Sequence, residues 1–305
     1  MAIVKTDVPM TYARCEQAIL ELAKKHPFLR TEVLTETAQG RNIRTLVIGN
    51  GARKVIYSAA WHANEWITTP VLLKFVEEFA EALQNGGEIF GVNAGDLAAK
   101  ATIYTVPMVN PDGVDLVTGA IAPDQKAYQN AALIADNFPS IPFPEGWKAN
   151  LNGVDLNLQF PAGWLRAREI KFLQGYNRPA PRDYVGRAPL SQREAKAMAG
   201  YTEYIDPALV LAYHAQGKEI YWSFMDYVVP GARELGEAFA RVSGYTLTEP
   251  APGSSYAGYK DWFIKVFRRP GYTIEVGSGV NPLPLSQFGE IYRDNLGILV
   301  SAAIG

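Results

Sequence analysis

The chain has 305 residues, of which 48% are hydrophobic and 20% charged, values typical of a globular protein that buries a large core without disulfides. Its 29 basic and 31 acidic residues give a formal net charge of −2, which argues against a nucleic acid or a membrane as partner. The first residues do not resemble a signal peptide, and we see no transmembrane segment and no wall-binding repeat, so we expect a cytoplasmic protein.

The first quarter of the chain alternates between helical and strand patterns. Apolar residues at helical spacing predict a helix over residues 11–25, and we expect His26, which follows it, to lie on the surface. Alternating polar and apolar residues on either side of a glycine turn predict a hairpin over residues 32–48. Residues 54–60 then predict a buried strand, and residues 70–83 a second helix.

The middle of the chain is richer in glycine and proline. Several glycines between residues 86 and 95 predict a loop, and residues 101–109 predict another buried strand. The sequence Asn-Pro-Asp-Gly at residues 110–113 is a strong turn signal. Little periodicity follows as far as Pro189, and a loop-rich stretch of this length inside a domain usually carries function.

The last third returns to regular elements. Ser191 and Glu194 form a capping-box pattern, which predicts a helix over residues 191–204 with Ser191 as its N-cap. Further patterns predict strands at residues 208–213 and 271–276 and helices at residues 231–242 and 286–304. Because we find no linker, we expect residues 1–305 to form one domain with a mixed sheet between two helical layers.

Two of the three histidines follow buried strands. His62 and Glu65 come directly after the strand at residues 54–60, and His214 ends the strand at residues 208–213. The carboxyl ends of strands in α/β sheets are where ligands bind. Two histidines and one glutamate that leave a fourth position open are typical of catalytic zinc sites, so we expect one zinc ion per chain at His62, Glu65 and His214.

Glu275 is the only acid inside an otherwise apolar strand. A carboxylate in such a place is costly unless it is paired or used in chemistry, and we favour a role as general base. The alternative is a structural acid that pairs with Arg268 or Arg269, which are near in sequence.

Several segments together resemble the zinc metallocarboxypeptidases in order and spacing; they are His62–Trp66, Asn110–Gly113, Gly153–Asn157, Tyr213–His214 and Thr273–Gly277. The resemblance covers nearly the whole chain and implies an α/β/α sandwich around a mixed, roughly eight-stranded sheet. It also implies that Glu275 activates water and protonates the leaving amine. Asp155 would hydrogen-bond a zinc histidine, and Tyr256 would cover the substrate.

The departures from the family pattern bear on the substrate. Leu158 stands where the family has an arginine that binds the substrate's terminal carboxylate, and Asn64 replaces another common arginine. Asn157–Trp164 resembles instead the bacterial branch that cleaves γ-D-glutamyl-diaminopimelate bonds. We therefore predict zinc-dependent hydrolysis of this amide in peptidoglycan peptides, with Asn157 among the substrate-binding residues. A carboxypeptidase or amidohydrolase with another substrate, and a non-catalytic metal-binding or peptide-binding homologue, are the alternatives.

Two further substrate contacts are open at this point. The arginine that stabilises the oxyanion in the family is missing before Gly153, and Lys148, the amide of Asn152 or a more distant arginine such as Arg166 could replace it. Lys260 would lie near the pocket for the leaving group, where it could bind the far carboxylate of meso-diaminopimelate; the alternative is a solvent-facing lysine.

Overall fold

The computed structural model describes residues 2–305. Within this range, no helix is both long enough and apolar enough to cross a membrane. The helices and strands in chain order are α1 (Tyr12–Lys25), β1 (Arg30–Glu36), β2 (Asn42–Ile48), β3 (Arg53–Ser58), α2 (Thr68–Asn85), β4 (Glu88–Ile89), β5 (Val92–Asn93), α3 (Ala94–Lys100), β6 (Ala101–Val106), α4 (Pro111–Val117), α5 (Lys126–Ala135), α6 (Trp164–Leu173), α7 (Arg193–Ile205), β7 (Leu209–His214), β8 (Glu219–Tyr221), α8 (Ala232–Ser243), β9 (Thr246–Thr248), α9 (Tyr259–Phe267), β10 (Gly271–Glu275) and α10 (Phe288–Ile304).

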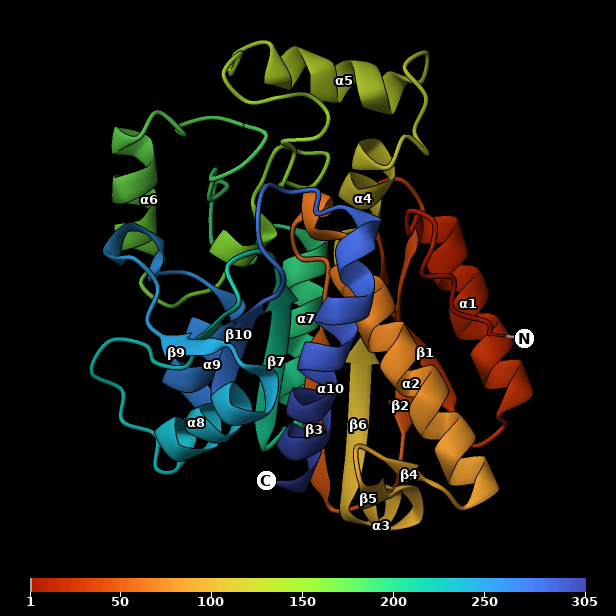
Figure 1. Ribbon diagram of the computed structural model, residues 1–305. Helices are drawn as coiled ribbons and strands as arrows, with labels where there is room; N and C mark the ends of the chain where they lie inside the picture. The colour runs from red at the N-terminus through yellow and green to blue at the C-terminus, as the bar shows by residue number, and fades with distance from the viewer. Residues whose placement is uncertain (1) are drawn as a thin grey trace.

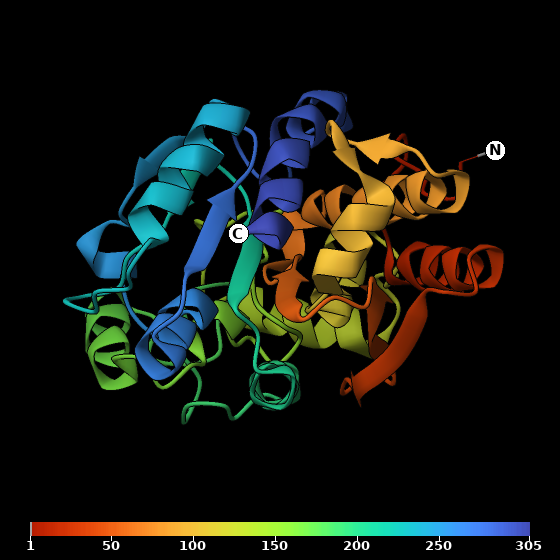
Figure 2. The ribbon, with the colours of Figure 1, turned by 90° about the horizontal axis from the view of Figure 1, so that it is seen from below.

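One mixed sheet of eight strands forms the middle layer, in the order β1-β2-β6-β3-β7-β10-β8-β9. Its centre is parallel, from β6 through β3 and β7 to β10, whereas β1, β2 and β8 join it antiparallel to their inner neighbours. Helices α1, α2, α8 and α10 cover one face, and α7 and α9 cover the other (Figures 1 and 2). The predicted α/β/α sandwich with a mixed, eight-stranded sheet is confirmed.

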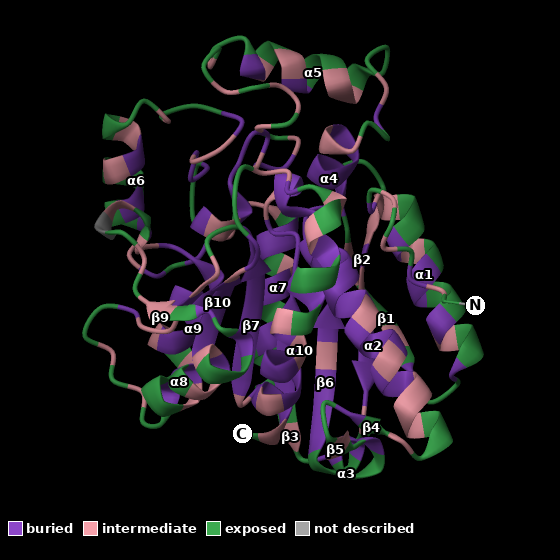
Figure 3. Cartoon of the chain, viewed as in Figure 1, coloured by how far each residue is buried: buried purple, intermediate pink, exposed green. Residues whose placement is uncertain are grey.

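The central strands are apolar on both faces because helices cover both. In β3, Val55 and Tyr57 join the larger apolar cluster, beneath α2 and α10, while Ile56 between them joins the cluster beneath α7 and α9. Side chains of consecutive strand residues point to opposite faces. A strand that is buried on both faces therefore lacks the alternation of polar and apolar residues seen in a strand with one exposed face. The middle strands β6, β3, β7 and β10 are accordingly buried over most of their length (Figure 3).

The parallel centre brings the predicted site residues to one edge of the sheet. The ends of β3, β7 and β10 are neighbours, and Glu275 of β10 pairs in register with His214 of β7. His62 follows β3 after a turn in which Ala60 has a positive φ of 48°. In Figure 1 this edge is at the top of the sheet, beneath α5, α6 and the loops that join them.

The predicted turn at Asn110 is wrong, because this residue begins helix α4. The Asn110 side chain accepts a hydrogen bond from the Gly113 amide, and Pro111 occupies the first helical position. Asparagine and proline favour helix starts and tight turns for the same reasons, so the sequence pattern did not distinguish them. The side-chain amide of Asn110 also donates to the carbonyl oxygens of Trp61, Lys148 and Ala149. These bonds connect the loop that carries His62 to the segment around Lys148.

Other expectations also need correction. The stretch between residues 86 and 95, predicted as a loop, contains the β4–β5 hairpin and the start of α3, and the loop-rich middle contains α5 and α6. Ser191 does not cap α7: its hydroxyl donates to Gln159, and the helix begins after Gln192. His26 is buried rather than exposed, with its Nδ1 2.6 Å from the side-chain oxygen of Gln84. The short strands β8 and β9 and the helix α9 had no prediction.

We expect Asn110→Ala to lower the free energy of unfolding by about 2–4 kcal/mol, because it removes a helix cap and leaves buried carbonyl groups without their donor. Urea titration followed by circular dichroism would measure the loss. Asn93→Ala is the matched control, since the side-chain oxygen of exposed Asn93 caps α3 by accepting one hydrogen bond from the Asp96 amide, and its removal should cost only about 1 kcal/mol. Equal losses in both variants would contradict the linking role of Asn110.

Candidate metal centre and substrate cavity

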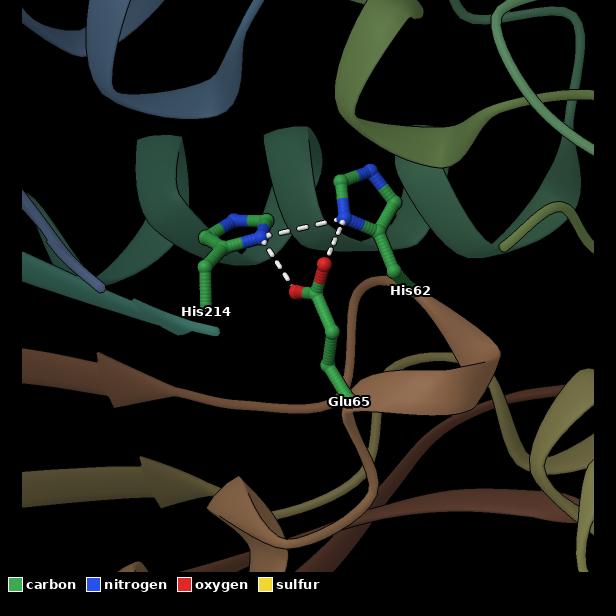
Figure 4. Close-up of side chains that lie close together, drawn as sticks. All are labelled: His62, Glu65 and His214. Carbon is green, nitrogen blue, oxygen red and sulfur yellow. Dashed lines mark hydrogen bonds and ion pairs between the residues drawn. The ribbon is translucent and has the colours of Figure 1, made fainter. Parts of the chain in front are cut away.

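His62, Glu65 and His214 bring their donor atoms together at the carboxyl ends of β3 and β7 (Figure 4). His62 Nδ1 lies 2.9 Å from Glu65 Oε1, and His214 Nδ1 lies 3.0 Å from Glu65 Oε2. The two Nδ1 atoms are 3.3 Å apart. His62 precedes a 3-10 turn, Ala63–Glu65, in which residues three apart lie above one another, so His62 and Glu65 face the same way. His214 completes the set from the neighbouring strand.

Asp155 orients one of these histidines. Its Oδ1 lies 3.0 Å from His62 Nε2, so the proton on Nε2 can be donated to the carboxylate while Nδ1 keeps its lone pair for a metal. The Asp155 carboxylate also accepts hydrogen bonds from the backbone amides of Asn157 and Asp183. The role predicted for Asp155 therefore has the geometry that it requires.

The charges at this centre favour a cation. Burial lowers the pKa of His62, but the carboxylates of Glu65 and Asp155 outweigh it and raise the pKa to about 9. Burial likewise raises the pKa of Glu65, but the charges of His62 and Lys148 hold the pKa well below its usual range. The carboxylates of Glu65 and Asp155 thus stabilise positive charge beside the Nδ1 atoms of the two histidines. Two imidazole nitrogens and one carboxylate are a donor set that suits zinc, so the residues present fit this ion.

Glu275 lies at the end of β10, beside the metal ligands. No hydrogen bond or ion pair engages its carboxylate within residues 2–305, and Arg269 pairs with Asp206 instead. Burial raises the pKa of Glu275 to about 8, and the negative charge of Glu65 acts in the same direction. A carboxylate that is held near a metal site and is not neutralised by a salt bridge can exchange protons with a substrate.

A cavity opens beside the three ligands and contains most of the predicted substrate-binding residues. Asn157 lies at its wall, where its side-chain oxygen accepts from the amide of Tyr259. Leu158 is also part of the wall, and its side chain has no hydrogen-bond donor. The lining includes His62, Lys148, Asp155, Asn157, Leu158, Tyr256, Lys260 and Glu275.

The three candidates for the missing oxyanion donor lie in different places. Lys148 lines the cavity, with its Nζ 2.8 Å from Glu65 Oε1. Asn152 does not line it, and the Asn152 side chain donates to Gln192. Arg166 is exposed on α6, where it pairs with Glu169. Of the three, only Lys148 is brought to the metal centre.

Lys260 is buried in the wall of the same cavity and does not face solvent. Its Nζ donates to the carbonyl oxygen of Ser223 at 2.5 Å and lies 2.7 Å from Asp261 Oδ1. An ammonium group has three protons, so these two partners leave one for a ligand.

A second cavity adjoins the first, and neither its position nor the residues that it shares with the first cavity were predicted from the sequence. It includes Asn64, whose side chain donates to the carbonyl oxygen of Glu145. The residues common to both cavities are Lys148, Arg182, Tyr221 and Glu275. Arg182 belongs to the loop-rich stretch and to no motif, so only its position in space identifies it.

Comparison with known proteins agrees with this geometry. A family model described as zinc carboxypeptidase matches residues 15–297. The chain is 46% identical over 290 residues to γ-D-glutamyl-L-diamino acid endopeptidase 1 of Lysinibacillus sphaericus, covering 95% of this chain and 71% of that protein. Bovine thrombin-activatable fibrinolysis inhibitor superposes with a TM-score of 0.73 at 16% identity, covering 98% of this chain and 97% of that one. Murein-tripeptide amidase MpaA from Escherichia coli O157 superposes with a TM-score of 0.57 at 20% identity, covering 89% and 91%. The two superpositions show a shared fold.

Proposed function

Because the chain belongs to the zinc carboxypeptidase family, we propose that it hydrolyses the amide bond between the γ-carboxyl group of D-glutamate and a diamino acid in peptidoglycan peptides. The family makes it a zinc metallopeptidase. The observation that supports this choice of substrate is the 46% identity, over nearly the whole chain, to an endopeptidase named for this bond.

The wall of the cavity lacks the donor with which an ordinary carboxypeptidase of the family binds its substrate. At Leu158 a terminal carboxylate would lose its water without gaining a hydrogen-bond donor, which is costly for a charged group. A cavity with this wall therefore disfavours the binding mode of a carboxypeptidase that uses an arginine at this position.

The chain's own residues divide the work of hydrolysis. His62, Glu65 and His214 would hold the zinc, which when bound supplies a Lewis acid that polarises oxygen atoms in the cavity. Glu275 takes a proton from the attacking water and later gives a proton to the nitrogen of the leaving diamino acid, so the amide bond breaks to an acid and an amine. Lys148 offers positive charge to the carbonyl oxygen of the reacting amide while negative charge develops on that oxygen. Tyr256 and Asn157 would contact the substrate from the cavity wall.

The proposal is tested by incubating the zinc-loaded protein with L-Ala-γ-D-Glu-meso-diaminopimelate and following the products by mass spectrometry. We expect L-Ala-D-Glu and free diaminopimelate, with little cleavage of α-linked dipeptides that end in a free carboxylate. Preferred cleavage of the dipeptides would indicate a carboxypeptidase, and the absence of any cleavage would indicate a non-catalytic homologue.

We expect Lys260 to recognise the far end of the diamino acid. Its buried ammonium has one free proton for the second carboxylate of meso-diaminopimelate, which lysine lacks. Lys260→Met should lower kcat/KM for the diaminopimelate peptide about 10-fold relative to the matching γ-D-Glu-L-Lys peptide. The ratio of the two substrates corrects for general damage to the fold, and an unchanged ratio would exclude the contact.

Two wider expectations remain proposals. We propose that residues 1–305 act as one catalytic domain, since strands from both ends of the chain share one sheet. The cytoplasmic location predicted from the sequence can be checked by fractionating the native cells.

A further inference from the structure

Arg182 lies where the two cavities meet, on the loop between α6 and α7. It lines both cavities together with Lys148, Tyr221 and Glu275, whereas Lys260 lines only the first. Consider a substrate whose reacting bond lies at Glu275 and whose diamino acid points toward Lys260. The part of this substrate on the other side of the reacting bond would extend past Arg182.

The backbone around Arg182 is fixed on both sides to the metal centre. The carbonyl oxygen of Pro181 accepts hydrogen bonds from the amides of Lys148 and Ala149. The amide of Asp183 donates to Asp155 Oδ2, while the other oxygen of Asp155 holds His62. The position of Arg182 is therefore tied to the residues that bind and orient the metal.

Asp183 also orients the guanidinium group. Asp183 Oδ2 accepts from Arg182 Nε at 2.6 Å, and Asp183 Oδ1 lies 2.6 Å from the ammonium group of Lys171. Within residues 2–305, the terminal nitrogens of Arg182 make no hydrogen bond. Since 41% of the side chain is exposed, these nitrogens are accessible from the cavity. A guanidinium whose two terminal nitrogens are free can bind a carboxylate through two parallel hydrogen bonds.

The other cations near the centre are already engaged. Lys148 is paired with Glu65, and Lys171 is paired with Asp183. Lys260 donates to Ser223, forms an ion pair with Asp261 and lines only the first cavity. Arg182 is also paired, with Asp183 through Nε, but within residues 2–305 its two terminal nitrogens have no hydrogen bond and it lines both cavities.

We propose that Arg182 binds the α-carboxylate of the γ-D-glutamyl residue and so favours γ-D-glutamyl substrates over peptides with a neutral residue at this place. In γ-linked glutamate, two methylene groups separate the reacting carbonyl from the carbon that bears the α-carboxylate, which places an anion close to the reacting bond on the side away from the diamino acid. An α-linked peptide with a neutral residue before the reacting bond has no anion on that side. This inference rests on the proposed function, since it identifies the charge by which that substrate is recognised.

The test compares L-Ala-γ-D-Glu-meso-diaminopimelate with the same peptide amidated at the α-carboxyl group of D-glutamate, which removes the charge and keeps the shape. We expect the wild-type protein to favour the acid by about 10- to 100-fold in kcat/KM, the usual range for a hydrogen-bonded charge pair. Arg182→Gln should slow cleavage of the acid by a similar factor and remove the preference. Arg166→Gln is the matched control, because Arg166 lies outside both cavities, and it should keep the wild-type preference.

The outcomes separate the inference from the proposed function. Cleavage of neither peptide by the wild-type protein would overturn the proposed function. Equal cleavage of both peptides by the wild-type protein would overturn the role of Arg182 and leave the proposed function intact. A preference that persists in Arg182→Gln would assign the carboxylate to another residue and would also overturn the inference. The wild-type comparison needs no variant, so it remains decisive even if Arg182→Gln does not fold.

Discussion

Replacing Glu275 by glutamine is expected to lower kcat by about 1,000- to 10,000-fold while the protein keeps its zinc. Glutamine has nearly the same shape but cannot take up and release a proton, and general acid–base catalysis contributes up to about this factor. Because Glu275 is not one of the three residues whose donor atoms meet, its replacement should leave the metal bound. Steady-state kinetics on the γ-D-glutamyl peptide and zinc analysis of the same sample would give both quantities.

Glu219→Gln is a suitable control for this variant. Glu219 lies opposite Glu275 on the neighbouring strand β8, but its carboxylate accepts a hydrogen bond from Tyr221 and lines neither cavity. We expect this variant to keep most of its activity. Activity retained in Glu275→Gln would mean that another group supplies the base.

The second large effect is expected from His214→Ala, which should lower bound zinc from about one ion per chain to nearly none and remove activity with it. His214 is buried and supplies one of the three donor atoms, and alanine has no donor to replace it. Elemental analysis after extended dialysis against metal-free buffer measures the zinc directly, independently of any substrate.

The third histidine of the chain provides the matched control. His26 is as buried as His214. It follows the end of α1, hydrogen-bonds Gln84 of α2 and takes part in none of the hydrogen bonds of the metal centre. His26→Asn should lose some stability and keep its zinc. If His214→Ala bound one zinc per chain as tightly as the wild-type protein, the metal centre would have to involve other residues.

The elements that the sequence predicted well are those in which a repeating pattern reflects burial. The apolar runs that became β3, β6, β7 and β10 read as buried strands because helices cover both faces of the sheet, and α1 shows the helical repeat of a single covered face. The metal ligands could be proposed for a related reason: the carboxyl ends of parallel strands lie at one edge of the sheet, whatever path the chain takes between the strands.

The elements that it predicted poorly lack a repeating pattern or share their signals with another structure. Asn110 and its neighbours can start a helix or make a turn, and only the carbonyl oxygens around Asn110 decide between them. The strands β8 and β9 have three residues each, too few to show an alternation. His26 was expected at the surface because the residues that cover it are distant in sequence; Gln84 is one of them.

The sequence by itself determined the layered α/β fold, the donor set for zinc and, through Leu158, the absence of the arginine that binds a terminal carboxylate in the family, because each depends on residue type at a fixed place along the chain. The tertiary structure decided which cations reach the centre. It brought Lys148 beside Glu65, left Asn152 and Arg166 outside the cavity, and placed Arg182 between the two cavities through hydrogen bonds made by the backbone. Backbone hydrogen bonds between distant loops leave no trace in residue type, so these positions could be read only from the folded chain.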